Sequence, residues 1–296
     1  MSIILHFSLP AIGFRRGFRG ALALSALGIG LWATTLRAAP RKLYNNPESV
    51  VFDAHHNRYL VSNKGDGKII QVAANGDKRV FNAERRSCRG LHIVGNRLYA
   101  ACNAGLAVID LQTGKTITVV AIPGRRFLND VAADAAGDLY VTDTGANRIF
   151  RIRQRDHAVS TFAHKGISHP NGILFDARNK RFLVCSWEPH PCIWAVRLAD
   201  GAVKTLIKPP FANLDGLAAD AEGRIYVSSG ATGKVYRYDA AFRKPPVVIA
   251  RGHAAPADIF INKQKHVLVI PNFGSHTLSF VPLVSTAGKP KDGKTR

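Results

Sequence analysis

The sequence lacks the motifs of several large enzyme classes. It has no Gly-x-Ser-x-Gly nucleophile turn, no His-Glu-x-x-His zinc motif and no dinucleotide fingerprint. A P-loop pattern does occur at 288–295, but a proline lies inside it and the chain ends one residue later. Since that pattern works only between a strand and a helix, we regard it as accidental. Chemistry based on any of these motifs is therefore not expected.

Cysteine is scarce, with four residues and no Cys-x-x-Cys pair, so a zinc site is not expected. Cys88 and Cys102 lie on either side of a hairpin that turns at 95–96, and Cys185 and Cys192 flank one loop. This placement predicts two local disulfides, Cys88–Cys102 and Cys185–Cys192, which suit an oxidising compartment. The alternative is four buried thiols.

Acidic residues are few. The chain has 20 Asp and Glu against 41 Lys and Arg, a net charge of +21. Residues 1–39 carry four arginines and no acid, so the rest of the chain keeps about +17 of the total. Basic residues gather in short clusters without interleaved aromatics: Arg85/Arg86, Arg151/Arg153/Arg155 and Arg178/Lys180/Arg181. We expect a solvated surface suited to an anionic cell envelope, and no nucleic-acid partner.

No apolar run is long enough for a membrane-spanning helix. The run 21–33 falls short of the ~20 residues required. Arg15 and Arg16 precede it and small residues follow it, which predicts an export signal over 1–39. The arginine pair with Phe18 also resembles a twin-arginine signal. We expect a periplasmic or secreted protein, with an uncleaved N-terminal anchor as the alternative.

What the chain does contain is a repeat. Units such as Asp215-Gly-Leu-Ala-Ala-Asp220 and Asn129-Asp-Val-Ala-Ala-Asp134 are each followed by a turn and a second apolar strand. Aligned copies start at positions 48, 89, 129, 171, 215 and 257, with spacings of 41, 40, 42, 44 and 42 residues. A period of this length with several short strands in each copy is typical of a β-propeller.

Six copies predict an all-β, six-bladed β-propeller over 40–284, built from four-stranded antiparallel blades. The last copy is one strand short, and the segment 41–44 could supply a strand. We expect this N-terminal strand to complete the last blade, because closure of that kind removes two exposed sheet edges. The remaining parts are the export signal and a disordered polar tail over 285–296.

The innermost strands of a propeller start at the same end of its central channel, so the repeated position is brought to one point. Around the ring, that position carries Glu48, Arg89, Asn129, Asn171, Asp215 and Ala257. The loop after each second strand lies at the same mouth, which adds as possible pocket walls Asn63, Asp143, Trp187, His190, Ser229, Asn272 and Phe273. The sequence therefore predicts a pocket at one mouth of the channel.

Four ring positions carry oxygen ligands. Glu48 and Asp215 offer carboxylates, and Asn129 and Asn171 offer amide oxygens. Calcium accepts this mixed shell, and its charge balances two carboxylates that would otherwise repel each other. These four residues predict a site for a divalent cation, with calcium as the best match. The alternative is that they are turn residues that satisfy local backbone donors.

The segments around these ligands resemble the senescence-marker-protein/gluconolactonase family of six-bladed propellers, which includes regucalcin-type lactonases. The resemblance covers about 45–283 and is carried by Pro47-Glu48-Ser49, Phe127-Leu-Asn-Asp130, Pro170-Asn171-Gly172 and Leu214-Asp215-Gly216. More distantly, the chain resembles paraoxonases, calcium-dependent phosphotriesterases and, at 143–148, NHL-repeat propellers.

The resemblance implies that Glu48, Asn171 and Asp215 bind a catalytic divalent metal. It implies that Asn129 is either a further metal ligand or a substrate or water contact. The implied reaction is metal-assisted hydrolysis, in which the cation polarises the substrate and a nearby water attacks. The family often has an arginine two residues before the blade-three asparagine, where this chain has Phe127. This departure bears on sugar-lactone specificity and leaves the metal site intact.

Asp215 is the candidate for both metal ligand and water-activating base, the alternative being coordination alone. Arg89 is a candidate to clamp an anionic substrate group, or else a solvated charge at the rim. The other candidate substrate contacts are Asn129, Asp143, Trp187 and His190. Trp187 is either a pocket wall or a cover over the expected disulfide. His169 and His253 lie near the same mouth and receive no role.

These features predict an exported, monomeric, metal-dependent hydrolase of the lactonase or esterase type with a small-molecule substrate. The rival interpretation is a non-catalytic propeller that binds a ligand or protein partner in the cell envelope. A third is an NHL-type interaction module without metal, in which Glu48 and Asp215 are ordinary turn residues.

Overall fold

The computed structural model describes residues 43–84 and 87–283, which form strands β1 to β23 and one 3-10 turn at Ala177–Asn179. The strands assemble into six antiparallel sheets in which neighbours in space are neighbours in sequence. Each sheet is therefore a meander joined by short turns. The all-β class and the six blades that the repeat predicts are confirmed.

Blade one holds β1 (Pro47–Asp53), β2 (Arg58–Asn63), β3 (Ile69–Ala73) and β4 (Lys78–Asn82). Blade two holds β5 (Cys88–Val94), β6 (Arg97–Cys102), β7 (Gly105–Asp110) and β8 (Thr116–Val120). Blade three holds β9 (Leu128–Ala133), β10 (Leu139–Asp143), β11 (Arg148–Ile152) and β12 (Val159–Ala163). Blade four holds β13 (Pro170–Asp176), β14 (Arg181–Ser186), β15 (Ile193–Arg197) and β16 (Val203–Ile207). Blade five holds β17 (Leu214–Ala219), β18 (Ile225–Ser229), β19 (Lys234–Tyr238) and β20 (Val247–Ala250). Blade six holds β21 (Phe260–Asn262), β22 (Val267–Asn272) and β23 (Thr277–Pro282).

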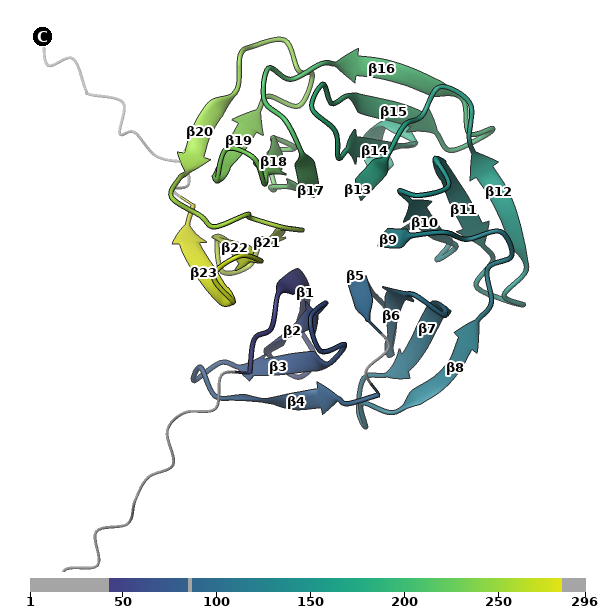
Figure 1. The fold of residues 1–296 in the computed structure, drawn as a ribbon, viewed down its shortest axis with the longest axis vertical. Coiled ribbons are helices and arrows are strands. Elements are labelled where there is room, and N and C mark those ends of the chain that lie inside the picture. Colours follow the sequence, from purple (N-terminus) through teal and green to yellow (C-terminus); the bar gives the residue numbers. More distant parts are fainter. Residues whose placement is uncertain (1–42, 85–86, 284–296) are drawn as a thin grey trace, which may run out of the picture. The chain divides into compact units, whose positions relative to one another are not determined.

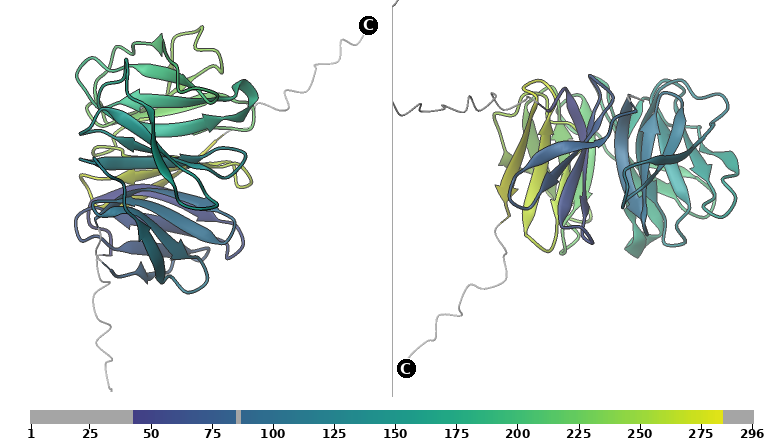
Figure 2. Two further views of the ribbon diagram at one scale, coloured as in Figure 1. Left: turned by 90° about the vertical axis from the view of Figure 1, so that its right-hand side faces the viewer. Right: turned by 90° about the horizontal axis from the view of Figure 1, so that it is seen from below.

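The blades stand around a central channel. Figure 1 shows β1, β5, β9, β13, β17 and β21 innermost, and the last strand of each blade at the outside. Figure 2 shows the blades from the side, with their strands running between the two faces of the ring. Since every innermost strand follows the same type of connection, all six run in the same sense along the channel.

Apolar side chains pack between the blades. Six buried hydrophobic clusters each combine residues of two neighbouring blades, and one of them joins blade six to blade one through Tyr59, Val61 and Val269. Between blades three and four, the ring centroids of Tyr140 and Phe182 lie 4.3 Å apart. A lone blade would leave both faces of its sheet exposed, so each blade requires both neighbours and the ring closes.

Five of the six innermost strands have the same irregularity near their first residue. In β1, Pro47 pairs with Asn63 and Val50 with Val61, so three steps on the inner strand match two on its partner. The same shift occurs in β5, β9, β13 and β17. This one-residue bulge lies at the repeated ring position and interrupts the alternation of side chains. A side chain that strict alternation would turn into the blade is therefore able to face the channel.

The sixth blade differs from the prediction. Its described sheet has three strands, and Leu43 and Tyr44, the described part of the expected closing strand 41–44, belong to no strand. The Leu43 carbonyl accepts a hydrogen bond from Asn63 Nδ2 (2.7 Å), and Tyr44 packs against the cluster between blades six and one. In the described residues, side-chain contacts rather than a shared ladder hold this segment to the ring.

The cysteines are only partly as predicted. Cys88 and Cys102 form the expected disulfide, but Cys185 and Cys192 are free. Cys185 belongs to the apolar cluster between blades four and five, whereas Cys192 packs against the cluster between blades three and four. Because the two side chains lie on opposite faces of one sheet, their sulfur atoms cannot meet. The predicted Cys185–Cys192 disulfide is wrong.

Several predictions fall outside the described residues. They concern the export signal 1–39, Arg41 and Lys42 of the closing strand, the basic pair Arg85/Arg86, the polar tail 285–296 and the P-loop-like pattern 288–295. Across 43–84 and 87–283, no helix has the length and apolar character required to cross a membrane.

Candidate active site at the channel mouth

A cavity of about 470 Å³ lies where the innermost strands begin. Five of the six ring residues line it: Glu48, Arg89, Asn129, Asn171 and Asp215. Each is the second residue of its innermost strand, in β1, β5, β9, β13 and β17 respectively. The structure thus brings together side chains that the sequence separates by about forty residues. The sixth ring residue, Ala257, is buried and does not line the cavity.

Glu48 and Asp215 are the carboxylates of this cavity, and both are buried, with 6% and 9% of their surface exposed. Glu48 Oε2 and Asp215 Oδ1 have no hydrogen-bond partner among the described residues. Burial raises the pKa of Asp215 to about 8, and repulsion from Asp130 adds to the effect. The pKa of Glu48 is raised well above its usual value by burial first and then by the charges of Asp215 and Asp130. Two buried carboxylates that repel each other favour a bound positive charge.

Asn129 and Asn171 contribute amide groups to the same cavity. Asn129 Nδ2 donates to Thr144 Oγ1 (3.0 Å), and Asn171 Nδ2 donates to the Leu214 carbonyl (3.3 Å). Since each amide nitrogen is engaged, the oxygen is the atom left to bind a ligand. Asn129 Oδ1 is buried and has no partner in the part of the chain that the structure describes. A turn residue would use this oxygen to accept a local backbone N–H. The turn-residue interpretation therefore leaves these buried oxygens unexplained.

The donor set fits a hard divalent cation. Two carboxylates and two amides supply only oxygen, which calcium prefers, and the carboxylates match its charge. Within the described parts of the chain, no three His, Cys, Asp or Glu side chains cluster in a way that suits a metal ion. A cation at this mouth must therefore take amide oxygens as well as carboxylates. The unpartnered oxygens of Glu48, Asn129 and Asp215 are the atoms that it would satisfy.

Arg89 is buried, with 5% of its surface exposed, and is not a solvated charge at the rim. Its Nη1 donates to Asn103 Oδ1 (3.0 Å) and to the Leu128 carbonyl (3.1 Å). Its Cζ lies 3.9 Å from the centroid of the Phe127 ring. Burial lowers the pKa of Arg89, and the charge of Glu48 opposes this effect. The guanidinium is thus held in one orientation at the cavity wall.

Aromatic side chains form much of the wall. Trp187 and Phe273, both predicted as walls, line the cavity together with Phe127. The edge of the Trp187 indole lies over Gly230, where an added Cβ would come within 2.8 Å of Cη2. No disulfide joins the cysteines on either side of the Trp187 loop, so this side chain is a wall and not a disulfide cover.

The remaining lining residues share a position in the repeat that was not predicted from the sequence. Lys64, Thr144, Trp187 and Phe273 each come directly after the last residue of a second strand. The prediction had named the last strand residue in most blades, which is one position too early. Those residues lie outside the lining and bond neighbouring loops instead: Asn63, Asp143, Ser229 and Asn272. His169 also lines the cavity, although no role was predicted for it.

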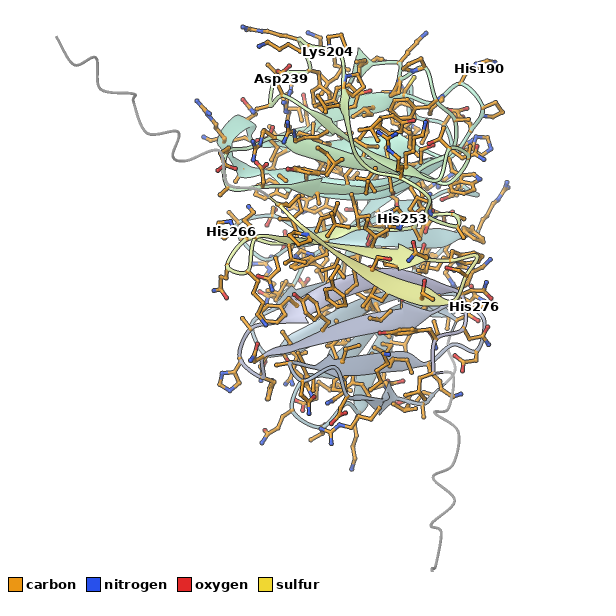
Figure 3. The ribbon with its side chains drawn as sticks, turned by 90° about the vertical axis from the view of Figure 1, so that its left-hand side faces the viewer. His190, Lys204, Asp239, His253, His266 and His276 are labelled. Carbon is orange, nitrogen blue, oxygen red and sulfur yellow. A yellow bond between two sulfur atoms is a disulfide. The ribbon has the colours of Figure 1, made fainter. Side chains whose placement is uncertain are left out.

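Two predicted substrate contacts are thereby corrected. The buried Asp143 carboxylate accepts the N–H groups of Arg126 (2.7 Å), Phe127 (2.8 Å) and Ala146 (2.8 Å), so it shapes the loop that carries Phe127. His190 is exposed in the loop after β14, and Figure 3 shows it at the periphery of the molecule. Neither side chain lines the cavity.

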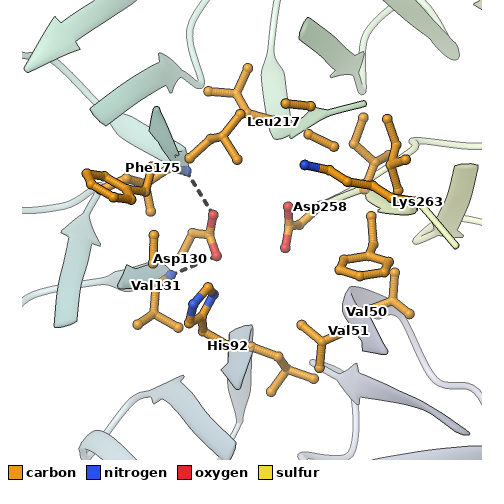
Figure 4. A pocket seen from close by; sticks show the side chains of 18 residues that line it. Val50, Val51, His92, Asp130, Val131, Phe175, Leu217, Asp258 and Lys263 are labelled. Carbon is orange, nitrogen blue, oxygen red and sulfur yellow. Dashed lines mark hydrogen bonds between the residues drawn. The ribbon is translucent and has the colours of Figure 1, made fainter. Parts of the chain in front are cut away.

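A second cavity of about 260 Å³ lies further along the same strands. Figure 4 shows Asp130 and Asp258 facing each other across it. Asp130 accepts the N–H groups of Val131 (2.7 Å) and Ile173 (2.8 Å), and Asp258 accepts the hydroxyl of Ser49 (2.6 Å). Burial raises the pKa of Asp130 to about 7, and burial with the charge of Asp130 raises that of Asp258 well above its usual value. Neither acid was predicted from the sequence.

A signal for these acids exists in the repeat. The position after each ring residue carries Ser49, Gly90, Asp130, Gly172, Gly216 and Asp258. A Cβ on Gly90 would lie 2.4 Å from Asp130 Cα, and one on Gly216 would lie 2.5 Å from Asp258 Cα. Each aspartate therefore requires a glycine in the preceding blade, because the backbones approach too closely for a side chain.

The same architecture occurs in known proteins. A family model described as the SMP-30/gluconolactonase/LRE-like region matches residues 46–249. A gluconolactonase from Xanthomonas campestris has a TM-score of 0.70 and 17% identity, with 80% of this chain and 86% of that chain covered. A calcium-binding regucalcin from Agrobacterium tumefaciens has a TM-score of 0.63 and 19% identity, with 77% and 83% covered. A streptogramin B lyase has a TM-score of 0.64 and 13% identity, with 82% and 84% covered. At these identities the likeness to solved structures shows a shared fold. No sequence among curated proteins matches the chain.

Proposed function

We propose that this chain, which belongs to the SMP-30/gluconolactonase/LRE-like family, is a metal-dependent hydrolase of a small lactone or related ester. The observation that carries the proposal is the set of buried, unpartnered oxygens on Glu48, Asn129 and Asp215 in one cavity. Each such atom costs about 1–3 kcal/mol unless a ligand satisfies it. A divalent cation, with calcium as the best match to oxygen-only donors, would satisfy all three. The similarity of the fold to a gluconolactonase and to a calcium-binding regucalcin supports this choice.

Glu48, Asn129, Asn171 and Asp215 would hold the cation. When bound, it supplies Lewis acidity that polarises the substrate carbonyl and lowers the pKa of a nearby water. Asp215 Oδ1, which has no hydrogen-bond partner in the described residues, would bind the cation, and the second carboxylate oxygen of Asp215 would accept the proton of the attacking water. The water oxygen adds to the acyl carbon, the acyl C–O bond breaks and the departing oxygen takes up a proton. A lactone is thereby opened to a hydroxy acid.

We also propose that the chain is exported to the periplasm or secreted. The Cys88–Cys102 disulfide supports an oxidising compartment, because disulfides are rare in a reducing cytosol. The basic and apolar residues of 1–39 support export as well. Cell fractionation with N-terminal sequencing tests this proposal. Recovery of the chain from the cytosol with Met1 intact and both cysteines reduced would contradict it.

Thermal unfolding with added calcium tests the cation site. A cation at 100 times its Kd that binds only the folded state stabilises it by about 2.7 kcal/mol. For a domain of this size, that raises the melting temperature by roughly 5–11 °C. Magnesium at the same concentration is the matched control and is expected to act more weakly, since it demands stricter octahedral geometry. If neither calcium nor any other divalent cation stabilises the protein, the interaction module without metal is favoured.

A substrate panel tests the chemistry. Aldonolactones, aryl esters and phosphotriesters are offered at saturating calcium, and turnover of at least one carboxylic ester class, abolished by chelator, is expected. If calcium stabilises the protein but no compound turns over, the hydrolase is contradicted. The rival, a non-catalytic propeller that binds a ligand or partner in the cell envelope, would then be favoured.

A further inference from the structure

The mouth cavity contains a buried positive charge, the guanidinium of Arg89, that the proposed metal site does not require. Arg89 is 5% exposed, and no carboxylate of the described residues forms an ion pair with it at 4.0 Å or less. The influence of Glu48 on its pKa acts through space only. A buried charge without a counter-ion is unfavourable, so a position of this kind points to an anionic ligand.

The contacts of Arg89 leave part of the guanidinium free. Its Nη1 is engaged by Asn103 and Leu128, and its face lies against Phe127. Its Nε, by contrast, is buried without any partner in the described residues. These contacts fix the plane of the group before a ligand arrives. The hydrogen bonds of Arg89 within the described residues use only Nη1, so the edge formed by Nε and Nη2 can donate the two parallel hydrogen bonds that a planar carboxylate accepts.

The charges of the mouth favour the same ligand. A divalent cation would neutralise Glu48 and Asp215, which leaves Arg89 and Lys64 as uncompensated positive charges of the lining. The Lys64 Nζ lies 5.3 Å from the centroid of Phe273, so both cations lie against aromatic rings of the same wall. The metal-loaded cavity is therefore expected to attract anions.

The lining has little to offer to a polyhydroxylated substrate. Thr144 Oγ1 already donates to the Pro170 carbonyl (2.7 Å) and accepts from Asn129. The amide nitrogens of Asn129 and Asn171 are also engaged. Apart from Lys64, Arg89 and His169, the rest of the wall is largely aromatic: Phe127, Trp187 and Phe273. Most sugar hydroxyls would lose water here without finding partners, because only Lys64, Arg89 and His169 remain as donors, whereas an apolar body would gain from burial.

We propose that the cavity selects a substrate with an apolar body and one carboxylate, and that Arg89 is the residue that determines this specificity. The reaction that follows binding rests on the proposed function, but the selection itself is a property of binding and is tested as such. On this basis, neutral aldonolactones are poor substrates and carboxylate-bearing apolar lactones or aryl esters are good ones.

The test compares three probes by calorimetry at saturating calcium: 4-phenylbutyrate, 4-phenylbutanol and D-gluconate. We expect the butyrate to bind tighter than the alcohol by on the order of tenfold or more, because its hydrogen bonds to Arg89 are charge-assisted. We expect gluconate, which keeps the carboxylate but has a polyol body, to bind more weakly than the butyrate. An Arg89→Gln variant should bind the butyrate and the alcohol equally.

Arg125→Gln is the matched control. Arg125 is exposed and lies outside the cavity lining, although its Nε donates to the carbonyl of Asn103 (2.9 Å), the residue that also binds Arg89. This variant should keep the full preference for the butyrate. Arg89→Lys retains the positive charge but lacks the planar guanidinium, and its preference for the butyrate over the alcohol should be intermediate. Should Arg89→Gln fail to fold, the lysine variant alone decides the question.

Three results would overturn the inference. They are equal binding of the acid and the alcohol, a preference that survives in Arg89→Gln, and tighter binding of gluconate than of the butyrate. A preference that survives would mean that the calcium ion itself holds the carboxylate. The calcium-induced shift in melting temperature and the turnover assay are measured separately on the same samples. Their failure alongside an Arg89-dependent preference contradicts the hydrolase and leaves the binding inference intact.

Discussion

Two neighbouring sets of buried polar side chains share the strands of the channel but differ in their hydrogen bonds. At the mouth, Glu48, Asn129 and Asp215 each have a buried oxygen that finds no hydrogen-bond partner within residues 43–84 and 87–283. One residue further along, Asp130 accepts two backbone N–H groups and Asp258 accepts a serine hydroxyl. Burial and raised pKa values are common to the acids of both sets. Only the unsatisfied set calls for a ligand.

The satisfied acids hold the ring together. Asp130 on β9 accepts from the N–H of Ile173 on β13, and so ties blade three to blade four. Asp258 accepts from Ser49 and its own N–H donates to the Glu48 carbonyl (2.9 Å), which ties blade six to blade one. A perturbed pKa is therefore not enough to assign a function to a channel carboxylate, whereas the count of its partners separates the two groups.

The largest contrast is expected in calcium affinity. Asp215→Asn removes one of two anionic ligands, so we expect its calcium Kd to rise by at least about 100-fold, which corresponds to about 2.7 kcal/mol. Asp130→Asn should change the Kd by less than about fivefold, because Asp130 already has protein partners. Calorimetric titration of both variants provides the measurement. Comparable losses in the two would erase the distinction between the sets.

Stability without metal should respond in the opposite way. Asp130→Ala leaves the N–H groups of Val131 and Ile173 without acceptors, which costs about 2 kcal/mol and lowers the melting temperature by roughly 4–8 °C. Asp215→Asn removes a buried charge without breaking a side-chain hydrogen bond, so in chelator it should be neutral or stabilising. Calorimetry of both variants in chelator checks this. A destabilised Asp215→Asn would argue against the unsatisfied oxygen.

A smaller effect is expected in the pH dependence of the melting temperature of the metal-free protein. The pKa of Asp215 is raised from 3.8 to about 8 in the folded chain, so between these values the folded state binds more protons than the unfolded state. Its contribution to stability is present below about pH 4 and is lost as the pH rises through about 8. The melting temperature of the native chain should therefore fall relative to that of Asp215→Asn between pH 5 and pH 8, a comparison made in chelator. Parallel curves would contradict the raised pKa.

The smallest effect concerns the contact between Cys185 of blade four and the backbone of Asp215 in blade five. Cys185 Sγ donates to the Asp215 carbonyl (3.1 Å), and Cys185→Ala should cost about 1 kcal/mol while changing the calcium Kd by less than about threefold. Cys192→Ala is the control, since Cys192 is half-buried on the other face, and its cost should stay within about 0.5 kcal/mol. Equal costs in chemical denaturation would show that the thiol contact does not matter.

The wall residues show where sequence reasoning stopped. Asn63 and Asp143 end second strands and are expected at the wall, but the next residues, Lys64 and Thr144, line the cavity. Successive side chains of a strand point to opposite sides, so an error of one position moves a residue from the cavity to the blade. The ends of both strands are as predicted, so the error lies in which residue near the strand end faces the cavity. His190 was misplaced for another reason, since the sequence does not tell how far a loop extends from the channel.

The sequence by itself determined the six copies, their order and the meeting of residues 48, 89, 129, 171 and 215 at one mouth, because a constant period makes these positions equivalent. Only the tertiary structure decided which oxygens are left without partners and which acids are satisfied. It also decided that Cys185 and Cys192 lie on opposite faces of a sheet. The physical reason is that hydrogen bonds in the channel join atoms of different blades, and a one-residue bulge redirects the side chains that form them.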